Sequence, residues 1–176
     1  MSPFAESIVL VLRNLLSIFL LPFMIAVVMP AWIVTSWAAV DTRWPTGTAL
    51  AMVAHIAGAL LFLAGFALFA WCVSLFARIG QGTLAPWDPP TKFVAVGPYR
   101  HVRNPMISGV LTMLLGEALH LGSRLVAAWA LTFLIMNQIH FLLIEEPGLS
   151  RLFGASYGKY KASVPRWIPR RSAWNE

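Results

Sequence analysis

The stretch that decides the organisation of this chain reads Gly97-Pro-Tyr-Arg-His-Val-Arg-Asn-Pro-Met-Ile-Ser-Gly109. It places Arg100, His101 and Arg103 just before Pro105, where an apolar run begins. Proline is favoured at the first helical position because the N–H that it lacks would have no partner there. The free N–H groups of such a helix start, beside two arginines, would attract a carboxylate or a phosphate. The stretch therefore predicts half of a ligand site at a membrane surface.

The composition is that of an integral membrane protein. Hydrophobic residues make up 59% of the 176 residues and charged residues 11%, with a mean hydropathy of +0.72, whereas a soluble domain carries about 25% charged residues. The formal net charge is +6. In a membrane protein, such a charge indicates topology and contact with anionic lipid, so we expect no nucleic-acid partner. No cysteine/histidine cluster has metal spacing, and we expect no metal.

Four apolar stretches predict an all-α membrane protein with about four transmembrane helices. They cover residues 14–40, 48–77, 105–121 and 125–144. Pro22 and Pro30 predict kinks or a break in the first stretch, and Gly58 and Gly65 predict close helix contact in the second. Ser123 is the expected N-cap of the fourth. A cytoplasmic amphipathic helix is expected over residues 149–161.

The distribution of positive charge predicts the orientation. If the 78–104 loop and the C-terminal tail are cytoplasmic, eleven of the 13 Lys and Arg residues lie on that side, and only Arg43 and Arg124 lie on the other. The positive-inside rule therefore predicts a multi-pass protein, of the inner membrane in a bacterial cell, with both termini in the cytoplasm.

Polar residues gather at the end of the fourth apolar stretch. Glu145 and Glu146 close it, at the negative end of the expected helix dipole, so a cation should compensate them. Arg103, the tail arginines or a cationic ligand could do so. Gln138 shares a helix face with Glu145, and His140 lies on a neighbouring face. These polar groups either contact another helix or face a wet cavity.

The tail continues with Phe153-Gly154-x-x-Tyr157-x-x-Tyr160 and then a basic end. A basic amphipathic helix of this kind can lie on anionic lipid. Alternatively, tyrosines three residues apart on one helix face can stack on a flat ligand.

Five blocks together resemble the isoprenylcysteine carboxyl methyltransferase family and the related phospholipid N-methyltransferases. The blocks are Gly97-x-Tyr99, Arg103-Asn104-Pro105-x-Ile107-x-Gly109, Glu145-Glu146, Phe153-Gly154-x-x-Tyr157-x-x-Tyr160 and Val164-Pro165-Arg166-x-Ile168-Pro169. They span roughly residues 97–170. The family usually has histidine at Asn104 and an aromatic residue at Ile107. Asparagine still forms hydrogen bonds but does not titrate near neutral pH, so it can contact a cofactor but not transfer a proton.

The resemblance implies an enzyme that uses S-adenosylmethionine. It implies that residues 79–176 form a cofactor-binding catalytic part and residues 1–78 an N-terminal part with the first two transmembrane helices. The implied cofactor-binding residues are Tyr99, Arg103, Asn104, Pro105, Gly109, Glu145, Glu146, Tyr157 and Tyr160. Arg103 and Glu145 are the expected catalytic residues, and Gln138, His140 and Arg166 the expected substrate contacts. Arginine and a helix start suit the cofactor carboxylate, the glutamates its ammonium or ribose, and the tyrosines its adenine or sulfonium.

The expected reaction is methyl transfer to a lipophilic or amphiphilic carboxylate, amine or thiol, drawn from lipid at the cytoplasmic face. One alternative is an NADPH-dependent membrane reductase of the sterol-reductase type. In that case the arginines could hold the phosphates of NADPH. Another is a non-catalytic lipid-binding scaffold, which the changes at Asn104 and Ile107 favour. The sequence contains no Gly-x-Gly-x-x-Gly fingerprint after a strand, so a Rossmann cofactor domain is not expected.

Overall fold

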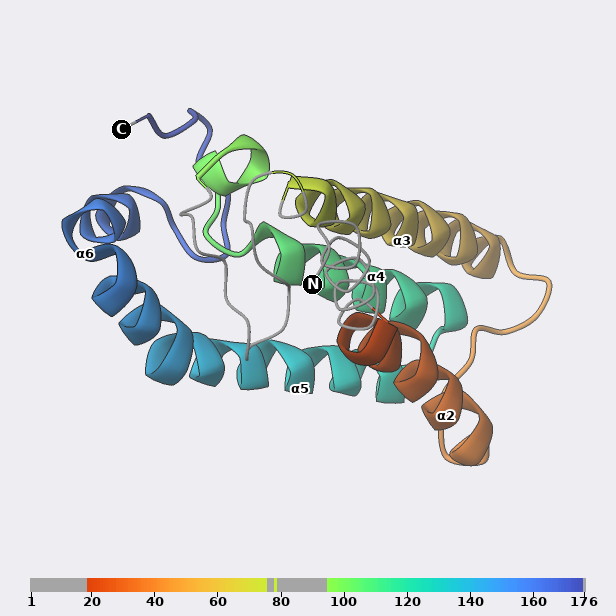
Figure 1. Cartoon of the computed structure of the whole chain (residues 1–176). Helices are drawn as coiled ribbons and strands as arrows, with labels where there is room; N and C mark the ends of the chain where they lie inside the picture. Colours follow the sequence, from red (N-terminus) through yellow and green to blue (C-terminus); the bar gives the residue numbers. More distant parts are fainter. Residues whose placement is uncertain (1–18, 76–77, 79–94, 176) are drawn as a thin grey trace, which may run out of the picture.

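The computed structural model describes residues 19–75, 78 and 95–175, and within these ranges the chain is helical and has no β-strand (Figure 1). The helices are η1 Phe19–Val28, α2 Met29–Ser36, α3 Ala49–Leu75, η3 Gly97–Arg100, α4 Pro105–Leu121, α5 Arg124–His140, η4 Phe141–Glu145 and α6 Glu146–Ser163. The expected all-α class is confirmed for this part of the chain. Residues 14–18 of the first apolar stretch lie outside the described ranges.

Helices α3, α4 and α5 follow one another as a set of packed neighbours. Helix α4 contacts both α3 and α5, while η1 and α2 pack against α4 and α5. Helix α6 extends the course of α5 and is kinked at Gly154, whose backbone is not helical, so that the C-terminal tail returns beside η3 (Figure 1). This return brings the C-terminal tail against the segment that contains η3, although the two are far apart in the sequence.

Glycines let α3 and α4 approach closely, as the sequence predicts for Gly58 and Gly65. A Cβ on Gly58 would lie 2.4 Å from the His120 nitrogen, and one on Gly116 would lie 2.6 Å from the Phe62 nitrogen. One helical repeat further, a Cβ on Gly65 would lie 2.6 Å from the Gly109 carbonyl oxygen. Backbone contact of this kind is typical of membrane helices. Lipid provides no hydrophobic driving force between helices, so small residues that allow close van der Waals packing hold them together.

The outer surface of α3 is apolar. Met52, Ile56 and Leu63 are between 56% and 61% exposed, although they are large hydrophobic side chains. By length and composition, two helical segments can cross a membrane, Ala49–Leu75 and the segment Arg124–Ser163 that contains the kink at Gly154; the apolar helices Pro22–Ser36 and Pro105–Leu121 are shorter. These two segments have the length and composition of membrane spans, and the number of four spans stays a prediction.

The predicted helix end at Glu145 and Glu146 is wrong. Helix α5 passes through the π-helical turn η4 directly into α6, and Glu146 is the first residue of α6. Pro147 lies in that first turn. A widened π turn just before a proline relieves the lost backbone hydrogen bond, which explains why the helix bends there without ending.

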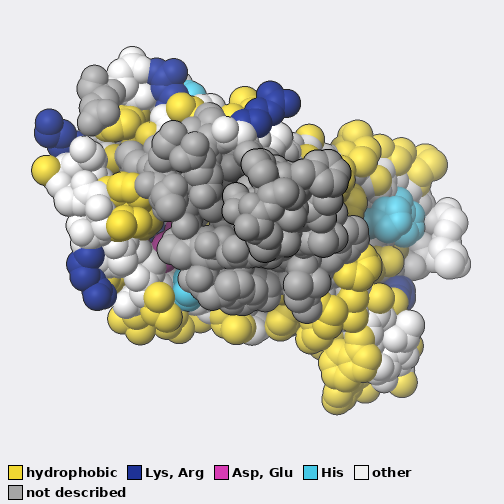
Figure 2. Space-filling model, viewed as in Figure 1, with side chains coloured by type: hydrophobic (Ala, Val, Ile, Leu, Met, Phe, Trp, Pro, Cys, Tyr) yellow, Lys and Arg dark blue, Asp and Glu magenta, His cyan; other side chains and the backbone are white. Residues whose placement is uncertain are grey.

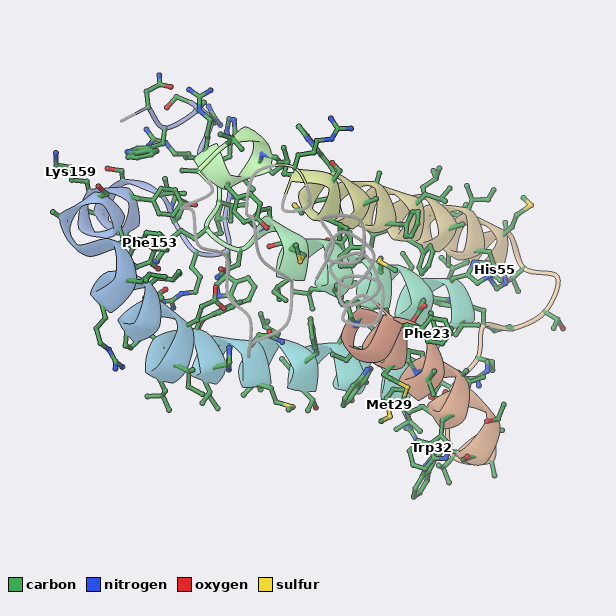
Figure 3. All side chains as sticks on the ribbon, in the orientation of Figure 1. Phe23, Met29, Trp32, His55, Phe153 and Lys159 are labelled. Atoms are coloured by element: carbon green, nitrogen blue, oxygen red, sulfur yellow. The ribbon has the colours of Figure 1, made fainter. Side chains whose placement is uncertain are left out.

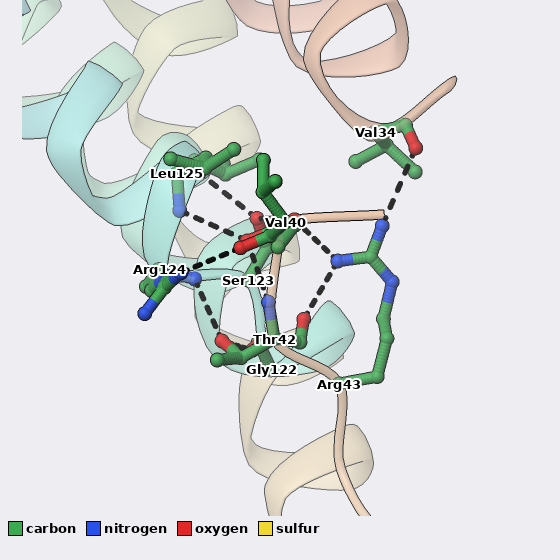
Figure 4. A network of polar contacts seen from close by, with 10 residues as sticks. Val34, Val40, Thr42, Arg43, Gly122, Ser123, Arg124 and Leu125 are labelled. Atoms are coloured by element: carbon green, nitrogen blue, oxygen red, sulfur yellow. Dashed lines mark hydrogen bonds and ion pairs between the residues drawn. The ribbon is translucent and has the colours of Figure 1, made fainter. Parts of the chain in front are cut away.

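A network around Asp41 joins the loop after α2 to the turn between α4 and α5 (Figure 4). The Asp41 carboxylate accepts hydrogen bonds from Ser123 Oγ at 2.6 Å, from Leu125 N at 3.2 Å and from the Arg43 guanidinium. Ser123 Oγ also accepts from Val126 N at 3.0 Å, which confirms the predicted N-cap of α5. Burial opposes ionisation of Asp41, but its hydrogen bonds with Ser123, Arg43 and the backbone outweigh it and lower its pKa to about 2.

Candidate functional site

The 97–109 stretch meets α6 and the C-terminal tail at one end of the molecule. Helix η3 and the start of α4 come from that stretch, and α6 curves round to face them (Figure 1). Most of the Lys and Arg side chains visible in Figure 2 lie over this end, whereas hydrophobic side chains cover α2 and the far end of α3. The Lys and Arg residues that the sequence assigns to one side of the membrane are therefore mostly found at one end of the visible face.

Glu146 lies at the centre of a charged cluster with Arg103, Lys161 and Arg166. Its Oε1 atom is 2.7 Å from Arg103 Nη1 and 2.7 Å from Arg166 Nη2, and its Oε2 atom is 2.9 Å from Lys161 Nζ. The Glu146 side chain is 5% exposed, and those of Arg103 and Arg166 are 12% and 15% exposed. The predicted compensation of the glutamate pair by Arg103 and a tail arginine is thus confirmed for Glu146.

This charged cluster has a surplus of positive charge. One carboxylate faces three cations, which leaves a net charge of about +2. Arg103 and Arg166 are mostly buried, whereas the Lys161 side chain is 44% exposed. In addition, Arg103 Nε is buried and has no hydrogen-bond partner among the described residues. A buried guanidinium nitrogen without a partner costs free energy, so an anionic group that accepts from it would stabilise the site.

The C-terminal tail holds the 97–103 segment in place by backbone pairing. Arg103 N donates to the Pro165 carbonyl, Arg170 N donates to the His101 carbonyl, and Trp174 N donates to the Arg100 carbonyl, each at 2.9 Å. The His101 ring Nδ1 donates back to the Arg170 carbonyl at 2.9 Å. This pairing fixes the position of Arg103, and it gives the His101 ring a structural hydrogen bond to the tail.

The three predicted tyrosines lie together behind the charged cluster. Tyr99, Tyr157 and Tyr160 are 7%, 2% and 3% exposed. Tyr160 Oη donates to the Tyr99 carbonyl at 2.7 Å, and the Tyr160 ring packs edge-on against Trp174. Burial raises the pKa of the Tyr99 hydroxyl, and the neighbouring Cys72 adds to the rise. The tyrosines therefore form a packed support for the 97–103 segment, and their role in ligand binding stays a prediction.

Glu145 differs from Glu146 although the two are adjacent. The Glu145 side chain is half-buried, and no described residue forms a hydrogen bond or an ion pair with it. It is adjacent to Glu146 and lies close enough to Tyr99 to add to the rise in the pKa of the Tyr99 hydroxyl. Glu146 is thus neutralised by three cations, and the role of Glu145 in ligand binding stays a prediction.

Helix α6 presents one side to this site and another to the surroundings. Lys159 points away from the molecule in Figure 3, whereas Phe153 packs against the Tyr157 and Tyr160 group. Lys161 belongs to the cluster and Lys159 does not, and the two provide a matched pair for substitution.

The remaining predicted residues lie at the start of α4, at the contact between α3 and α4, and at the end of α5. Asn104 and Pro105 begin α4 beside Arg103, as expected. Gly109 contacts the Gly65 and Phe69 backbones on α3, away from any open site. Gln138 Oε1 accepts from Trp167 Nε1 at 2.8 Å, and His140 lies beside the Phe141 ring.

Sequence reasoning missed two residues. Lys161 was expected only as part of a basic helix, and Trp167 was not expected at the site at all. The spacing of Lys161 from Glu146 gives no signal, because the two come together only through a kink in α6 at Gly154, where φ is 55° and ψ is −127°. Trp167 docks the tail on α5 through Gln138 and the Phe141 ring, at 5.6 Å between ring centres.

Comparison with protein families places the chain in a known class. Residues 53–156 match the phospholipid methyltransferase family, which is more than half of the 176 residues. The chain therefore belongs to the phospholipid methyltransferase family, and this membership indicates a membrane methyltransferase. The match includes the 97–109 stretch, Glu145 and Glu146, and ends before Lys161 and Arg166. No curated protein and no solved structure matches the chain.

Proposed function

We propose that this chain transfers a methyl group from S-adenosylmethionine to a lipophilic or amphiphilic acceptor at the cytoplasmic membrane face. Membership of the phospholipid methyltransferase family supports methyl transfer. The choice of methyl donor rests on the chemistry of the site, and the choice of side on the positive charges that surround it.

The observation that carries the proposal is the pairing of opposite charges at one site. The methionine part of the proposed methyl donor bears a carboxylate and an ammonium group. Arg103, whose buried Nε atom has no described partner, offers a donor for the carboxylate. Glu145 directly precedes Glu146 in the sequence and has no described ion pair, so it offers an acceptor for the ammonium. Glu146 already faces three cations and would hold Arg103 in position.

The residues of this chain would mainly position and desolvate the reactants. S-adenosylmethionine, when bound, supplies a methyl group on a sulfonium that is already activated for transfer. Arg103 and Glu145 would orient it, while the packed tyrosines and the tail exclude water behind it. A carboxylate acceptor needs no base, and an amine acceptor would lose its proton to water or to Glu145. The acceptor would enter from lipid, near His140.

Calorimetry on the purified protein in detergent, with S-adenosylhomocysteine and NADPH side by side, tests the proposal. We expect S-adenosylhomocysteine alone to bind, and an Arg103→Ala variant to lose about tenfold or more in affinity, since a charge-assisted hydrogen bond contributes about 1.5–3 kcal/mol. Arg171→Ala, an exposed tail arginine, is the matched control. Binding of NADPH alone would support the reductase, and binding of neither would support a non-catalytic scaffold.

A further inference from the structure

A second candidate site lies at the opposite end of α4 from the charged cluster. A cavity of about 530 Å³ lies between α2 with the end of η1, α3 and the C-terminal part of α4. Val27, Pro30, Phe62, Leu63, Gly116 and Glu117 are among the residues that line it. Glu117 follows Pro105 by twelve residues, which places it about 18 Å along the helix. The cavity is therefore separate from the proposed methyl-transfer site.

The walls of this cavity are apolar apart from the side chains of Glu117 and His120. Glu117 Oε2 is buried and has no hydrogen-bond partner among the described residues. His120 also lines the cavity, but its Nδ1 atom already donates to the His55 carbonyl at 2.9 Å. A buried carboxyl oxygen without a donor is costly inside a membrane protein, and such groups mark ligand sites.

The cavity opens towards the lipid. Val27 and Leu63, on its rim, are 41% and 59% exposed, and both belong to apolar helices. A molecule dissolved in the bilayer could therefore reach the cavity without crossing water. Its volume lies within the range of about 300–1,000 Å³ that small-molecule sites occupy.

We propose that this cavity binds a single-chain membrane amphiphile whose head group donates one hydrogen bond, an amine or a hydroxyl, to Glu117. The apolar walls accept the chain, and the head group supplies the missing partner of Glu117 Oε2. The site binds its ligand whether or not the charged cluster transfers methyl groups, because the two lie at opposite ends of α4.

Photolabelling of the full chain in phosphatidylcholine nanodiscs tests this site. The probes are octadecylamine, octadecanol and octadecane, each with a diazirine at the same carbon. We expect the amine or the alcohol to label the peptides of α2, α3 and α4 that line the cavity, and the hydrocarbon to label the lipid-facing surface generally. Preference for the amine over the alcohol would mean that Glu117 binds as a carboxylate; equal labelling by both would mean a neutral hydrogen bond.

Two alanines in α3 provide the matched control. Ala59 lines the cavity, and Ala57, also exposed, does not. Ala59→Phe should lower cavity labelling about tenfold because a ring fills the space, while Ala57→Phe should not. Glu117→Leu should abolish the preference for the amine and alcohol over the hydrocarbon. Equal labelling by all three probes in the wild type, or labelling unchanged by Ala59→Phe, would overturn the proposal.

Discussion

At the scale of single residues, the two adjacent glutamates have different surroundings. Glu146 is buried against Arg103, Arg166 and Lys161, whereas the Glu145 side chain has no described ion pair. Removal of a buried carboxylate from such a cluster leaves cations without compensation, which is far more costly than loss of a surface ion pair. Glu146 therefore stabilises the fold, and ligand binding by Glu145 is the role that we propose for its neighbour.

Substitution of each glutamate by glutamine should separate these roles. We expect Glu146→Gln to destabilise the protein by about 3 kcal/mol, the lower end for a broken buried pair, because the cluster is partly exposed. Glu145→Gln should leave the melting temperature unchanged and lower S-adenosylhomocysteine affinity about tenfold or more. Thermal unfolding and calorimetry on the same preparations measure both effects. A stability loss at Glu145 equal to that at Glu146 would contradict the assignment.

At the scale of helices, close backbone contact and capping decide how the elements meet. Gly58 faces Gly116, and Gly65 faces Gly109, so α3 and α4 approach along one face of each. At the turn that follows α4, Asp41 and Ser123 satisfy the free N–H groups at the start of α5. Because lipid provides no hydrophobic drive between helices, these contacts carry much of the specificity of the packing.

The glycine contact predicts a sharp difference between neighbouring positions. Gly58→Val should separate α3 from α4, since its Cβ would lie 2.4 Å from the His120 backbone nitrogen. Overpacking of this kind costs about 1–3 kcal/mol or more. Ala57→Val, at an exposed position next in sequence, is the control. Size-exclusion chromatography and the melting temperature in detergent should show an effect for the first variant only.

The Asp41 network predicts a specific dependence of stability on pH. The pKa of Asp41 is about 2 in the folded protein against 3.8 ordinarily. A carboxyl group with a lowered folded-state pKa stabilises the protein above its unfolded pKa, and this contribution fades as the pH falls through the range towards the folded value. The difference in melting temperature between wild type and Asp41→Asn should thus be largest near neutral pH and shrink between about pH 4 and pH 2. A difference independent of pH would contradict this.

At the scale of the whole molecule, two polar ends are joined by apolar helices. The Asp41 network ties one end together, and the charged cluster with the returning tail ties the other (Figures 3 and 4). The tail is essential to the second end, because it pairs with the 97–103 segment and packs Trp174 on Tyr160. The site is therefore assembled from segments about sixty to seventy residues apart in the sequence.

Removal of residues 171–176 should loosen the site and leave the helices folded. The truncated protein loses the two hydrogen bonds between Trp174 and Arg100 and the ring contact with Tyr160. We expect unchanged helix content by circular dichroism, faster proteolysis near residues 95–103, and weaker S-adenosylhomocysteine binding. Trp174→Phe, which keeps a ring against Tyr160 and the backbone bonds, is the control and should bind nearly as well. Equal proteolysis of both proteins would show that the tail does not hold the segment.

Much of this architecture could be predicted from the order of residues alone. The apolar stretches, the proline at the start of α4, the Ser123 N-cap and the close contact of Gly58 and Gly65 depend on local propensity and spacing. The family also follows from sequence blocks, because their spacing persists in the chain. These features need only neighbours in the sequence or along one helix face.

Only the tertiary structure decided how the glutamates are used and what surrounds them. The sequence predicted a helix end at Glu145 and Glu146, but the π turn before Pro147 carries the helix on into α6. Within α6, a kink at Gly154 then turns Lys161 back to Glu146, and the tail that follows brings Trp167 to Gln138. Ion pairing depends on which distant side chains share a buried space, so only the folded chain distinguishes Glu146, which three cations neutralise, from Glu145, which has no described ion pair.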